Sequence, residues 1–379
     1  MKVGILGGGQ LGLMLAEALS RLDRQVTVLD SDPVAPVAAR LAQVITARYD
    51  DPEALSTLFE NARAVTFDSE NVPAEPLRPW ADKLIPSLGV LQVCQHRIQE
   101  KAFLSEHRFP TVRHKGVKLG SDVRAAAVEF GVPGSAKSAL GGYDGKSQFR
   151  LQSEADLSRL PSTSKGGWVL EEVFSLDTEL SCIVARSKTG EAFAFPVFEN
   201  LHHEHVLDFT LLPARVDPAL QADAERIATE LADKLGLVGL LTVEFFYGTG
   251  SDGVKKLAVN ELAPRTHNSG HVTRQACTFS QFDALARILA GVPLGKPSVH
   301  AGGWCMGNLL GDVWRAQDKQ GGPLDLSAWE KFPEVVDVFL YGKAEARPRR
   351  KMGHFVVRGP TQEAAMKTAR AFRAALMGE

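Results

Sequence analysis

Two glutamates occupy matching positions on neighbouring segments that have the composition of buried strands. Glu244 lies in the apolar run 239–247, and Glu261 follows the apolar residues 257–259. Asp252-Gly253 between the runs indicates a two-residue type I′ turn, which places Glu244 directly opposite Glu261. Facing carboxylates repel each other unless a cation lies between them, and hard oxygen ligands suit Mg²⁺ with nucleotide phosphates. Two solvent-facing acids on an exposed hairpin are the alternative, but the apolar flanks favour a metal site.

A polar segment rich in chemically active groups follows Glu261. Pro264 ends the strand, and residues 265–271 then bring together an arginine, two histidines, an asparagine, a serine and a glycine. Loops of this composition at the end of a strand commonly carry function. We therefore expect this segment to lie beside the metal site.

Two lysines flank a glycine-rich segment in the middle of the chain. Lys137 precedes Gly141-Gly142-Tyr143-Asp144-Gly145, and Lys146 follows it. Glycines let the backbone approach phosphates closely, and lysine supplies a positive charge to phosphate oxygens. The spacing is not that of a P-loop. The segment is therefore a phosphate-covering flap or a plain hairpin tip.

The first glycine-rich segment, Gly7-Gly8-Gly9-Gln10-Leu11-Gly12, lies between an expected strand (3–6) and an expected helix (13–22). With Asp30 at the end of the next strand, it reads as a dinucleotide fingerprint. Taken alone, it leaves open whether the anion is a pyrophosphate, a single phosphate or absent. Glu70, after the expected strand 64–67, is either a ligand contact or a helix cap.

Composition excludes several classes of protein. A net charge of -2 gives no electrostatic case for a nucleic acid or an anionic membrane as partner. The apolar runs are shorter than the roughly 18 residues that indicate a membrane span. Four cysteines without CxxC spacing indicate reduced thiols, a cytoplasmic protein and no zinc site. Residues 1–6 lead directly into an expected strand and a glycine-rich segment, so we expect no signal peptide. Three histidines at 202, 203 and 205 lack partners with metal-ligand spacing, so we expect one near a phosphate and the others in solvent.

The expected elements indicate an α/β protein. Strands at 42–46 and 64–67 alternate with helices at 52–61 and 76–83, which is typical of a parallel sheet. A helix at 95–104 places Arg97 and Lys101 on one face. Further helices are expected at 122–130 and 217–235, and further strands at 168–174, 178–185 and 192–197.

In this order the motifs resemble those of the ATP-grasp superfamily. Within it, the chain resembles the N5-carboxyaminoimidazole ribonucleotide synthetases over nearly its whole length. The resemblance rests on the first glycine segment, the flap at 141–145, residues 260–271, and a C-terminal set with Tyr341-Gly342-Lys343, Arg347-Pro348 and residues 350–354. Departures from the family pattern are Ser147 in place of a glycine, Leu13-Met14, and Arg349 where a small residue is usual.

The resemblance implies three domains and a homodimer. An N-terminal Rossmann-like domain would span 1–95, and a small α/β lid domain would span 96–170. The larger α+β ATP-grasp domain would span 171–379, with a small β-rich subdomain from about 300.

The resemblance also implies a role for each matched residue. The nucleotide would be bound by Arg97, Lys137, Gly142, Tyr143, Asp144, Gly145, Lys146, Ser147, Gln148, Glu171, Glu172, Val173, Phe174, Glu179, His202, Asn260 and Glu261. Aminoimidazole ribonucleotide would be bound by Gln10, Leu11, Glu70, Tyr143, Asp144, Arg265, His267, Asn268, Ser269, Lys343, Arg347 and Arg350. Mg²⁺ would be held by Glu244 and Glu261. The catalytic groups would be Asp144, Lys137, Arg265 and Asn268.

The implied activity is carboxylation of aminoimidazole ribonucleotide with ATP and bicarbonate, in purine biosynthesis, with Asp144 orienting or deprotonating the substrate amine. Within the superfamily, the alternative is another ligase, such as the formate-dependent glycinamide ribonucleotide transformylase. An NAD-dependent oxidoreductase would leave the lysines and the Glu244–Glu261 pair unexplained. A non-catalytic nucleotide-binding module is disfavoured because Lys137, Glu244 and Glu261 are all present.

Overall fold

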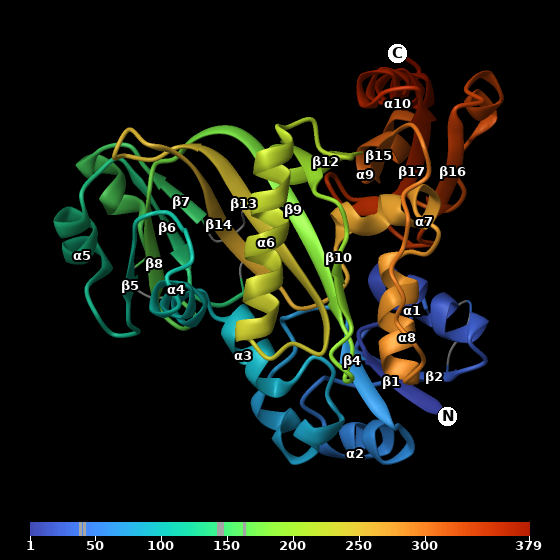
Figure 1. The fold of residues 1–379 in the computed structure, drawn as a ribbon, viewed down its shortest axis with the longest axis horizontal. Helices are drawn as coiled ribbons and strands as arrows, with labels where there is room; N and C mark the ends of the chain where they lie inside the picture. Colours follow the sequence, from blue (N-terminus) through green and yellow to red (C-terminus); the bar gives the residue numbers. More distant parts are fainter. Residues whose placement is uncertain (38–39, 41–42, 142–147, 162–163) are drawn as a thin grey trace.

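The structure is a computed structural model that describes residues 1–379 except 38–39, 41–42, 142–147 and 162–163. Its described strands form three sheets, which Figure 1 shows with their covering helices. The fold is mixed α/β, as the sequence predicts. No helix among the described residues combines the length and the apolar character needed to cross a membrane.

The first sheet is parallel, with strand order β3-β2-β1-β4. Its strands are β1 (Lys2–Leu6), β2 (Gln25–Asp30), β3 (Gln43–Thr46) and β4 (Ala64–Phe67), and its helices are α1 (Gln10–Arg21) and α2 (Pro52–Asn61). The prediction for α2 is confirmed. Asp51 is its N-cap and accepts a hydrogen bond from the Ala54 amide at 2.9 Å, and Pro52 fits the first helical position.

The next elements correct two sequence predictions. The expected helix at 76–83 is a 3₁₀ helix, η1 (Glu75–Lys83). The helix expected at 95–104 is present as α4 (Arg97–Glu106) but begins two residues later, because His96 has an extended backbone that separates it from α3 (Leu88–Gln95), a helix that was not expected. Apolar residues continue through both helices, which hides the break in the sequence. Arg97 and Lys101 remain on α4.

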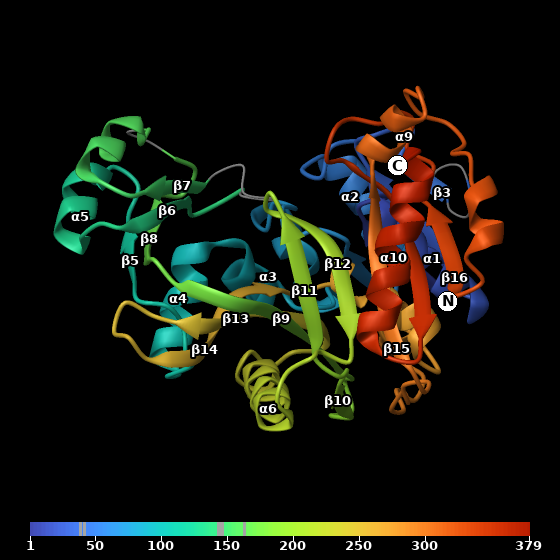
Figure 2. The same ribbon diagram turned by 90° about the horizontal axis from the view of Figure 1, so that it is seen from above.

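The second sheet is a small antiparallel unit with strand order β5-β8-β6-β7. Its elements are β5 (His114–Val117), α5 (Val123–Phe130), β6 (Gly134–Ser138), β7 (Gln148–Leu151), η2 (Glu154–Arg159) and β8 (Trp168–Glu172). A hydrophobic cluster that lies wholly between residues 117 and 170 holds it together. Figure 2 shows this lid sheet at the opposite end of the molecule from the C-terminal strands.

The third sheet has nine strands in the order β14-β13-β9-β11-β12-β15-β17-β16, with β10 paired to β9. Its strands are β9 (Ser175–Arg186), β10 (Ala192–Ala194), β11 (Phe198–His203), β12 (Val206–Leu212), β13 (Gly239–Thr249), β14 (Lys255–Ala263), β15 (Gly303–Leu310), β16 (Val335–Leu340) and β17 (Lys351–Gly359). The helical elements are α6 (Pro218–Lys234), η3 (Asn268–Val272), α7 (Thr273–Ala276), α8 (Gln281–Ala290), α9 (Gly311–Ala316), η4 (Ser327–Lys331) and α10 (Gln362–Met377). The C-terminal strands thus continue the sheet of the preceding domain, and the domain boundaries stay a prediction.

The largest hydrophobic core joins the first sheet to the third. Helix α1 lies beside α8 (Figure 1), and one buried cluster contains residues of β1, α1, β9 and α8. Across this docking, Glu70 after β4 contacts Arg265 in the polar segment 264–271 that follows β14.

Candidate active site

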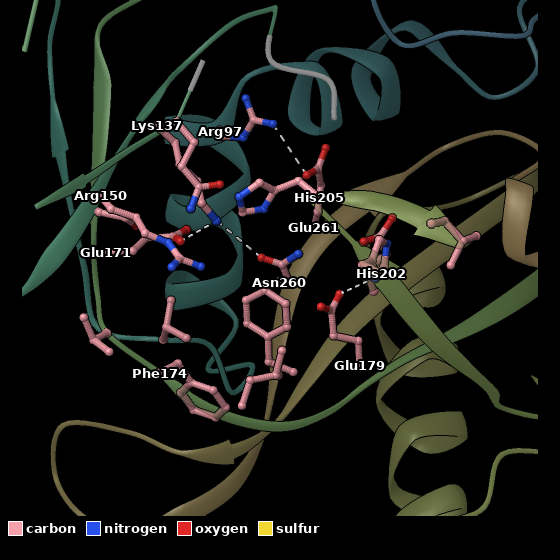
Figure 3. A pocket seen from close by; sticks show the side chains of 18 of the residues that line it. Arg97, Lys137, Arg150, Glu171, Phe174, Glu179, His202, His205, Asn260 and Glu261 are labelled. Carbon is pink, nitrogen blue, oxygen red and sulfur yellow. Dashed lines mark hydrogen bonds and ion pairs between the residues drawn. The ribbon is translucent and has the colours of Figure 1, made fainter. Parts of the chain in front are cut away.

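The candidate active site is a cavity of about 750 Å³ between the lid sheet and the third sheet. Figure 3 shows the side chains of Arg97, Lys137, Glu171, Asn260 and Glu261 converging on one space. Among the expected nucleotide-binding residues, those lining the cavity are Arg97, Lys137, Gln148, Glu171, Glu172, Val173, Phe174, Glu179, His202, Asn260 and Glu261. Glu70, Glu244, Arg265, His267 and Asn268 line it as well. The cavity therefore brings the two sets of expected ligand residues together.

The hairpin of β13 and β14 pairs Glu244 with Glu261, as the sequence predicts. The two-residue turn at Asp252-Gly253, which was expected to produce this pairing, is not present. The strands are joined by residues 250–254, since Thr249 pairs with Lys255, and a β-bulge between Glu244 and Phe245 shifts the register by one residue. The longer loop shifts the strand pairing by one residue, and the bulge shifts it back, so Glu244 still pairs with Glu261. The bulge leaves Asn260 without a cross-strand partner at the centre of the site.

Buried charges of α4 bind the backbone around this bulge. The Lys101 ammonium donates to the Asn260 carbonyl at 3.1 Å, and the Glu100 carboxylate accepts from the Leu262 amide at 2.8 Å. Burial and the Glu261 carboxylate raise the pKa of Glu100 to about 8. Lys137 in turn reaches the Asn260 side-chain oxygen at 3.5 Å. Helix α4 therefore fixes the backbone of the bulge, while Lys137 of β6 contacts the Asn260 side chain.

Glu171 bridges two lysines beneath the cavity. Its carboxylate lies 2.6 Å from the Lys137 ammonium and 3.3 Å from that of Lys101, and it is almost fully buried. Burial raises the pKa of this carboxyl, but the two ammonium groups outweigh burial and hold the pKa at about 2. Glu171 thus contributes a buried carboxylate that orients Lys137.

The paired glutamates have opposite electrostatic surroundings. Burial disfavours the Glu244 anion, but the His267 ring at 3.0 Å outweighs burial and lowers the pKa of Glu244 to about 2. For Glu261, burial and the neighbouring Glu244 raise the pKa, against the opposite influence of Arg97 at 3.5 Å. No cluster of three or more His, Cys, Asp or Glu side chains suited to a metal occurs among the described residues. Two carboxylates completed by phosphate oxygens fit Mg²⁺, which is seldom caged by protein alone.

The far end of the cavity suits a nucleoside. The Phe174 and Phe246 rings stack with centroids 6.1 Å apart, and Val173 and Leu176 expose apolar surface beside them. Glu179 lies 2.9 Å from the His202 ring. Burial disfavours the charged imidazole, but the Glu179 carboxylate outweighs it and raises the pKa of His202. A planar base thus has an apolar slot, and a sugar has a carboxylate within the same cavity.

The opposite end of the cavity joins the first sheet to the third. Glu70, after β4, forms a paired contact with the Arg265 guanidinium, in which one nitrogen lies 3.0 Å from Oε1. Burial raises the pKa of Glu70, but Arg265 outweighs burial and lowers it. Asn268 and Lys351 line the same wall. This wall presents positive and amide groups to an anionic or polar substrate.

The first glycine segment is arranged unlike a dinucleotide site. The Gly8 amide donates to the Asp30 carboxylate at 2.5 Å, and the Gly9 amide donates to Asp68 at 3.0 Å. Burial and Asp30 raise the pKa of Asp68 to about 6. Gly7 has a φ of +107°, and a Cβ there would lie 1.7 Å from an Asp68 oxygen. The Asp30 and Asp68 carboxylates thus accept hydrogen bonds from the backbone amides that would otherwise bind a pyrophosphate, which argues against the NAD alternative.

Several expected substrate-binding residues do not line the cavity. Ser269 is fully buried behind His267, and Gln10 and Leu11 lie on α1 away from the cavity wall. Arg347 is exposed and paired with Glu345 at 2.7 Å, and Arg350 donates to the Glu345 carbonyl at 2.9 Å. Lys343 donates to the Lys351 carbonyl at 2.8 Å. The predictions for Gly142, Tyr143, Asp144, Gly145, Lys146 and Ser147 lie outside the described residues.

Three basic side chains on the cavity wall were missed. Arg150 lies on β7, His205 lies at the β11–β12 turn, and Lys351 begins β17. Within the histidine cluster we expected His202 alone to face the nucleotide, whereas Figure 3 shows His205 pointing into the cavity too. Arg350 precedes β17 and donates to the Glu345 carbonyl, whereas Lys351 is the first residue of the strand. The family pattern pointed to Arg350, and no motif marked Lys351.

A nucleotide cavity between a small antiparallel lid and a larger sheet, with two facing carboxylates at its base, defines an ATP-grasp enzyme. Family models agree along the chain: a ribonucleotide synthetase preATP-grasp domain matches 1–95 and an ATP-grasp domain matches 102–282. A phosphoribosylaminoimidazole carboxylase C-terminal domain matches 305–368.

Relatives narrow the class to one family. The chain is 37% identical to the N5-carboxyaminoimidazole ribonucleotide synthase of Bacillus subtilis, over 93% of this chain and 90% of that protein. Its fold matches the ADP complex of the Staphylococcus aureus synthetase with a TM-score of 0.88 and 31% identity, covering 98% and 96% of the two chains. The Aspergillus clavatus synthase in complex with ADP and 5-aminoimidazole ribonucleotide matches with a TM-score of 0.85 and 28% identity, covering 100% and 98%. The chain belongs to the N5-carboxyaminoimidazole ribonucleotide synthase family, whose members are ATP-dependent ligases.

Proposed function

We propose that this chain carboxylates 5-aminoimidazole ribonucleotide with ATP and bicarbonate, giving N5-carboxyaminoimidazole ribonucleotide, ADP and phosphate for purine biosynthesis. The observation that carries the proposal is the single cavity, which joins the ATP-side groups Lys137, Asn260 and Glu261 to Arg265, His267 and Asn268. A reactive carboxyl group can pass between two substrates in that cavity without leaving the protein.

The chemistry follows from the charges on the cavity wall. A bicarbonate oxygen attacks the γ-phosphorus of ATP, ADP leaves, and carboxyphosphate forms. Arg97 and Lys137 stabilise the negative charge on the transferred phosphoryl group, since each ends at the cavity. The exocyclic amine of the ribonucleotide then attacks the carboxyl carbon, or CO₂ released from it, and phosphate departs. The amine gives up a proton, for which Asp144 remains our proposed acceptor.

Mg²⁺ is proposed as the metal, held by Glu244 and Glu261. When bound, it would neutralise charge on the phosphate oxygens. The facing carboxylates of the hairpin fit this role, because burial and the opposing Glu244 carboxylate disfavour the charged form of Glu261, which a cation between them would offset. A homodimer and a cytoplasmic location are further proposals. The first rests on the family resemblance and the second on four buried, unpaired cysteines.

The deciding experiment measures phosphate release from ATP and bicarbonate with and without aminoimidazole ribonucleotide. We expect release to rise when the ribonucleotide is added, and we expect formate with glycinamide ribonucleotide to have no effect. Absence of stimulation by aminoimidazole ribonucleotide would contradict the proposal, and stimulation by formate with glycinamide ribonucleotide would favour the transformylase.

The metal pair is tested by Glu261→Gln. The change removes one charge of the proposed Mg²⁺ site, and we expect turnover to fall by about 100-fold or more. Glu330→Gln, a matched change at an exposed position on η4, should leave turnover as it is. Wild-type turnover in Glu261→Gln at limiting Mg²⁺ would refute the metal pair.

A further inference from the structure

A continuous line of buried hydroxyl and amide groups ends on His267. Thr210 Oγ1 donates to Asn200 Oδ1 at 3.1 Å, and Asn200 Nδ2 donates to Ser181 Oγ at 2.8 Å. Ser181 Oγ donates to Ser269 Oγ at 2.9 Å, which lies 2.9 Å from His267 Nδ1. Ser181, Ser269 and Thr210 have no exposed surface, and Asn200 is 6% exposed. We call these four residues the hydroxyl chain.

The hydroxyl chain has a direction. The Asn200 amide nitrogen can only donate, so it occupies an acceptor position of Ser181 and leaves the Ser181 proton for Ser269. The Ser269 hydroxyl, having accepted that bond, turns its own proton toward His267 Nδ1. Each hydroxyl therefore donates toward the cavity.

A backbone amide fixes the same direction at the histidine. His267 is the N-cap of η3, and its Nδ1 accepts from the Ser269 amide at 3.4 Å. An amide N–H cannot become an acceptor, so this contact also favours a lone pair on Nδ1, but at 3.4 Å it is weaker than the hydroxyl bond at 2.9 Å. The proton of neutral His267 then lies on Nε2, which is 3.0 Å from Glu244 Oε1.

The backbone of His267 is also fixed on both sides. Its amide donates to Gln281 Oε1 at 2.9 Å, and its carbonyl accepts from Gln281 Nε2 at 2.6 Å. Gln281 is fully buried at the start of α8. The ring of His267 therefore has a fixed position as well as a fixed tautomer.

We propose that the hydroxyl chain holds His267 in its Nε2-protonated tautomer, so that His267 donates to Glu244 and positions that carboxylate for the cation. Ser269, Ser181, Asn200 and Thr210 are positioning residues that act through His267. The opposite tautomer would direct a lone pair at a carboxylate and an N–H at the Ser269 amide. Partners that orient metal-binding groups in this way commonly change metal affinity or activity by about 10- to 100-fold.

This inference rests on the proposed function for the identity of the cation, but the tautomer can be measured without ATP or ribonucleotide. The full-length protein is labelled with ¹⁵N-histidine, and the His267 signals are assigned by their absence in His267→Gln. We expect the wild-type spectrum to show the proton on Nε2 and a lone pair on Nδ1. Ser269→Ala removes the hydroxyl donor, and we expect a mixture of the two tautomers. In activity assays, the Mg²⁺ concentration for half-maximal turnover should rise by about 10-fold or more.

Further variants at other positions of the hydroxyl chain keep the proposal testable if Ser269→Ala fails to fold. Ser181→Ala and the isosteric Thr210→Val interrupt the hydroxyl chain farther from the ring, and should change the tautomer ratio in the same direction by less. Thr66→Val is the matched control, since Thr66 is equally buried on β4 and its hydroxyl has no hydrogen-bond partner among the described residues. It should leave the His267 spectrum and the Mg²⁺ requirement unchanged.

Two results would overturn the inference. One is a wild-type His267 that carries its proton on Nδ1. The other is an unchanged Nε2–H spectrum in both Ser269→Ala and Ser181→Ala, whatever happens to turnover. Failure of the proposed function is distinguishable, because it would show as absent ribonucleotide-stimulated phosphate release from a wild-type protein whose tautomer is as expected.

Discussion

Glu171 shows how one buried carboxylate can serve two cations with different tasks. Lys101 is 2% exposed and points its ammonium group at carbonyls of β14, while Lys137 lies at the cavity. Without Glu171, two ammonium groups would share a poorly solvated space, which is strongly unfavourable. The carboxylate therefore stabilises the fold and aims a phosphate-binding lysine at the same time.

The pH dependence of stability should reveal this carboxylate. The folded-state pKa of Glu171 is lowered to about 2, so its contribution is present above the ordinary value near 4.5 and is lost as pH falls toward 2. A shift of that size corresponds to about 3 kcal/mol. We expect Glu171→Gln to lower the urea midpoint at pH 7, and the difference from wild type to shrink between pH 4.5 and pH 3.

Asp177→Asn provides the comparison at the surface. Asp177 pairs with Lys255 at 2.6 Å, but both side chains are about half exposed, so the pair should contribute little. We expect its urea midpoint to follow wild type at every pH. A Glu171→Gln deficit that stays constant from pH 6 to pH 3 would show that the lysines do not depress the carboxyl pKa.

At the scale of elements, the β13–β14 hairpin shows what the sequence could and could not reveal. Apolar runs and an expected two-residue turn at Asp252-Gly253 predicted two paired strands with Glu244 facing Glu261, and that pairing is confirmed. The loop length was wrong, and nothing local in the sequence marks the bulge. It is held by Lys101 and Glu100, residues about 160 positions away in the chain. Bulges fixed by distant charges are not encoded in local pattern.

The residues of the candidate site also fall into those that could be predicted from the sequence and those that could not. The family resemblance, which rests on motif residues and their order, led to eleven of the expected nucleotide-binding positions on the cavity wall. Ser269 and Arg347 sit in equally suggestive motifs, yet one is buried and the other pairs with Glu345 on the surface. Tertiary packing decides whether a side chain faces the cavity, the core or solvent, and a sequence motif alone does not reveal that packing.

Gly270 tests how closely η3 must approach α8. A Cβ on Gly270 would lie 2.5 Å from the Gln281 side chain and 2.5 Å from Ile183. We expect Gly270→Ala to push η3 outward, costing about 1–3 kcal/mol of stability. Because His267 and Asn268 would move with η3, turnover should fall by up to about 100-fold. Unfolding midpoints and turnover measured on the same preparation check both effects.

Gly89→Ala is the matched control for this change. Gly89 lies in α3, and a Cβ added there would meet no described atom within 4 Å beyond its own helix, so alanine should be tolerated or slightly stabilising. Equal behaviour of the two variants would show that the η3–α8 approach is not tight.

At the scale of the whole molecule, the first sheet has two faces with different partners. One face is covered by residues of its own segment, in a cluster that runs from Leu6 to Leu91. The other face is covered by α1, which shares a buried cluster with Phe282, Leu285 and Ile288 of α8. Arg21 also pairs with Asp283 at 2.6 Å. The wall formed by Glu70 and Arg265 depends on this docking.

Residues 1–95 expressed alone should therefore keep the hydrophobic cluster that runs from Leu6 to Leu91 and expose the α1 surface that packs on α8. We expect this fragment to bind a hydrophobic dye and to self-associate, because the α1 surface that normally contacts α8 would meet water. Adding the fragment 96–379 should suppress dye binding if the two parts dock as in the intact chain, and only the mixture should support phosphate release. Dye fluorescence, light scattering and the phosphate assay measure these three effects. A monomeric 1–95 fragment that binds no dye and unfolds cooperatively would contradict this prediction. It would mean that the α1–α8 contact does not stabilise residues 1–95, and that Glu70 and Arg265 alone join the binding regions of the two substrates.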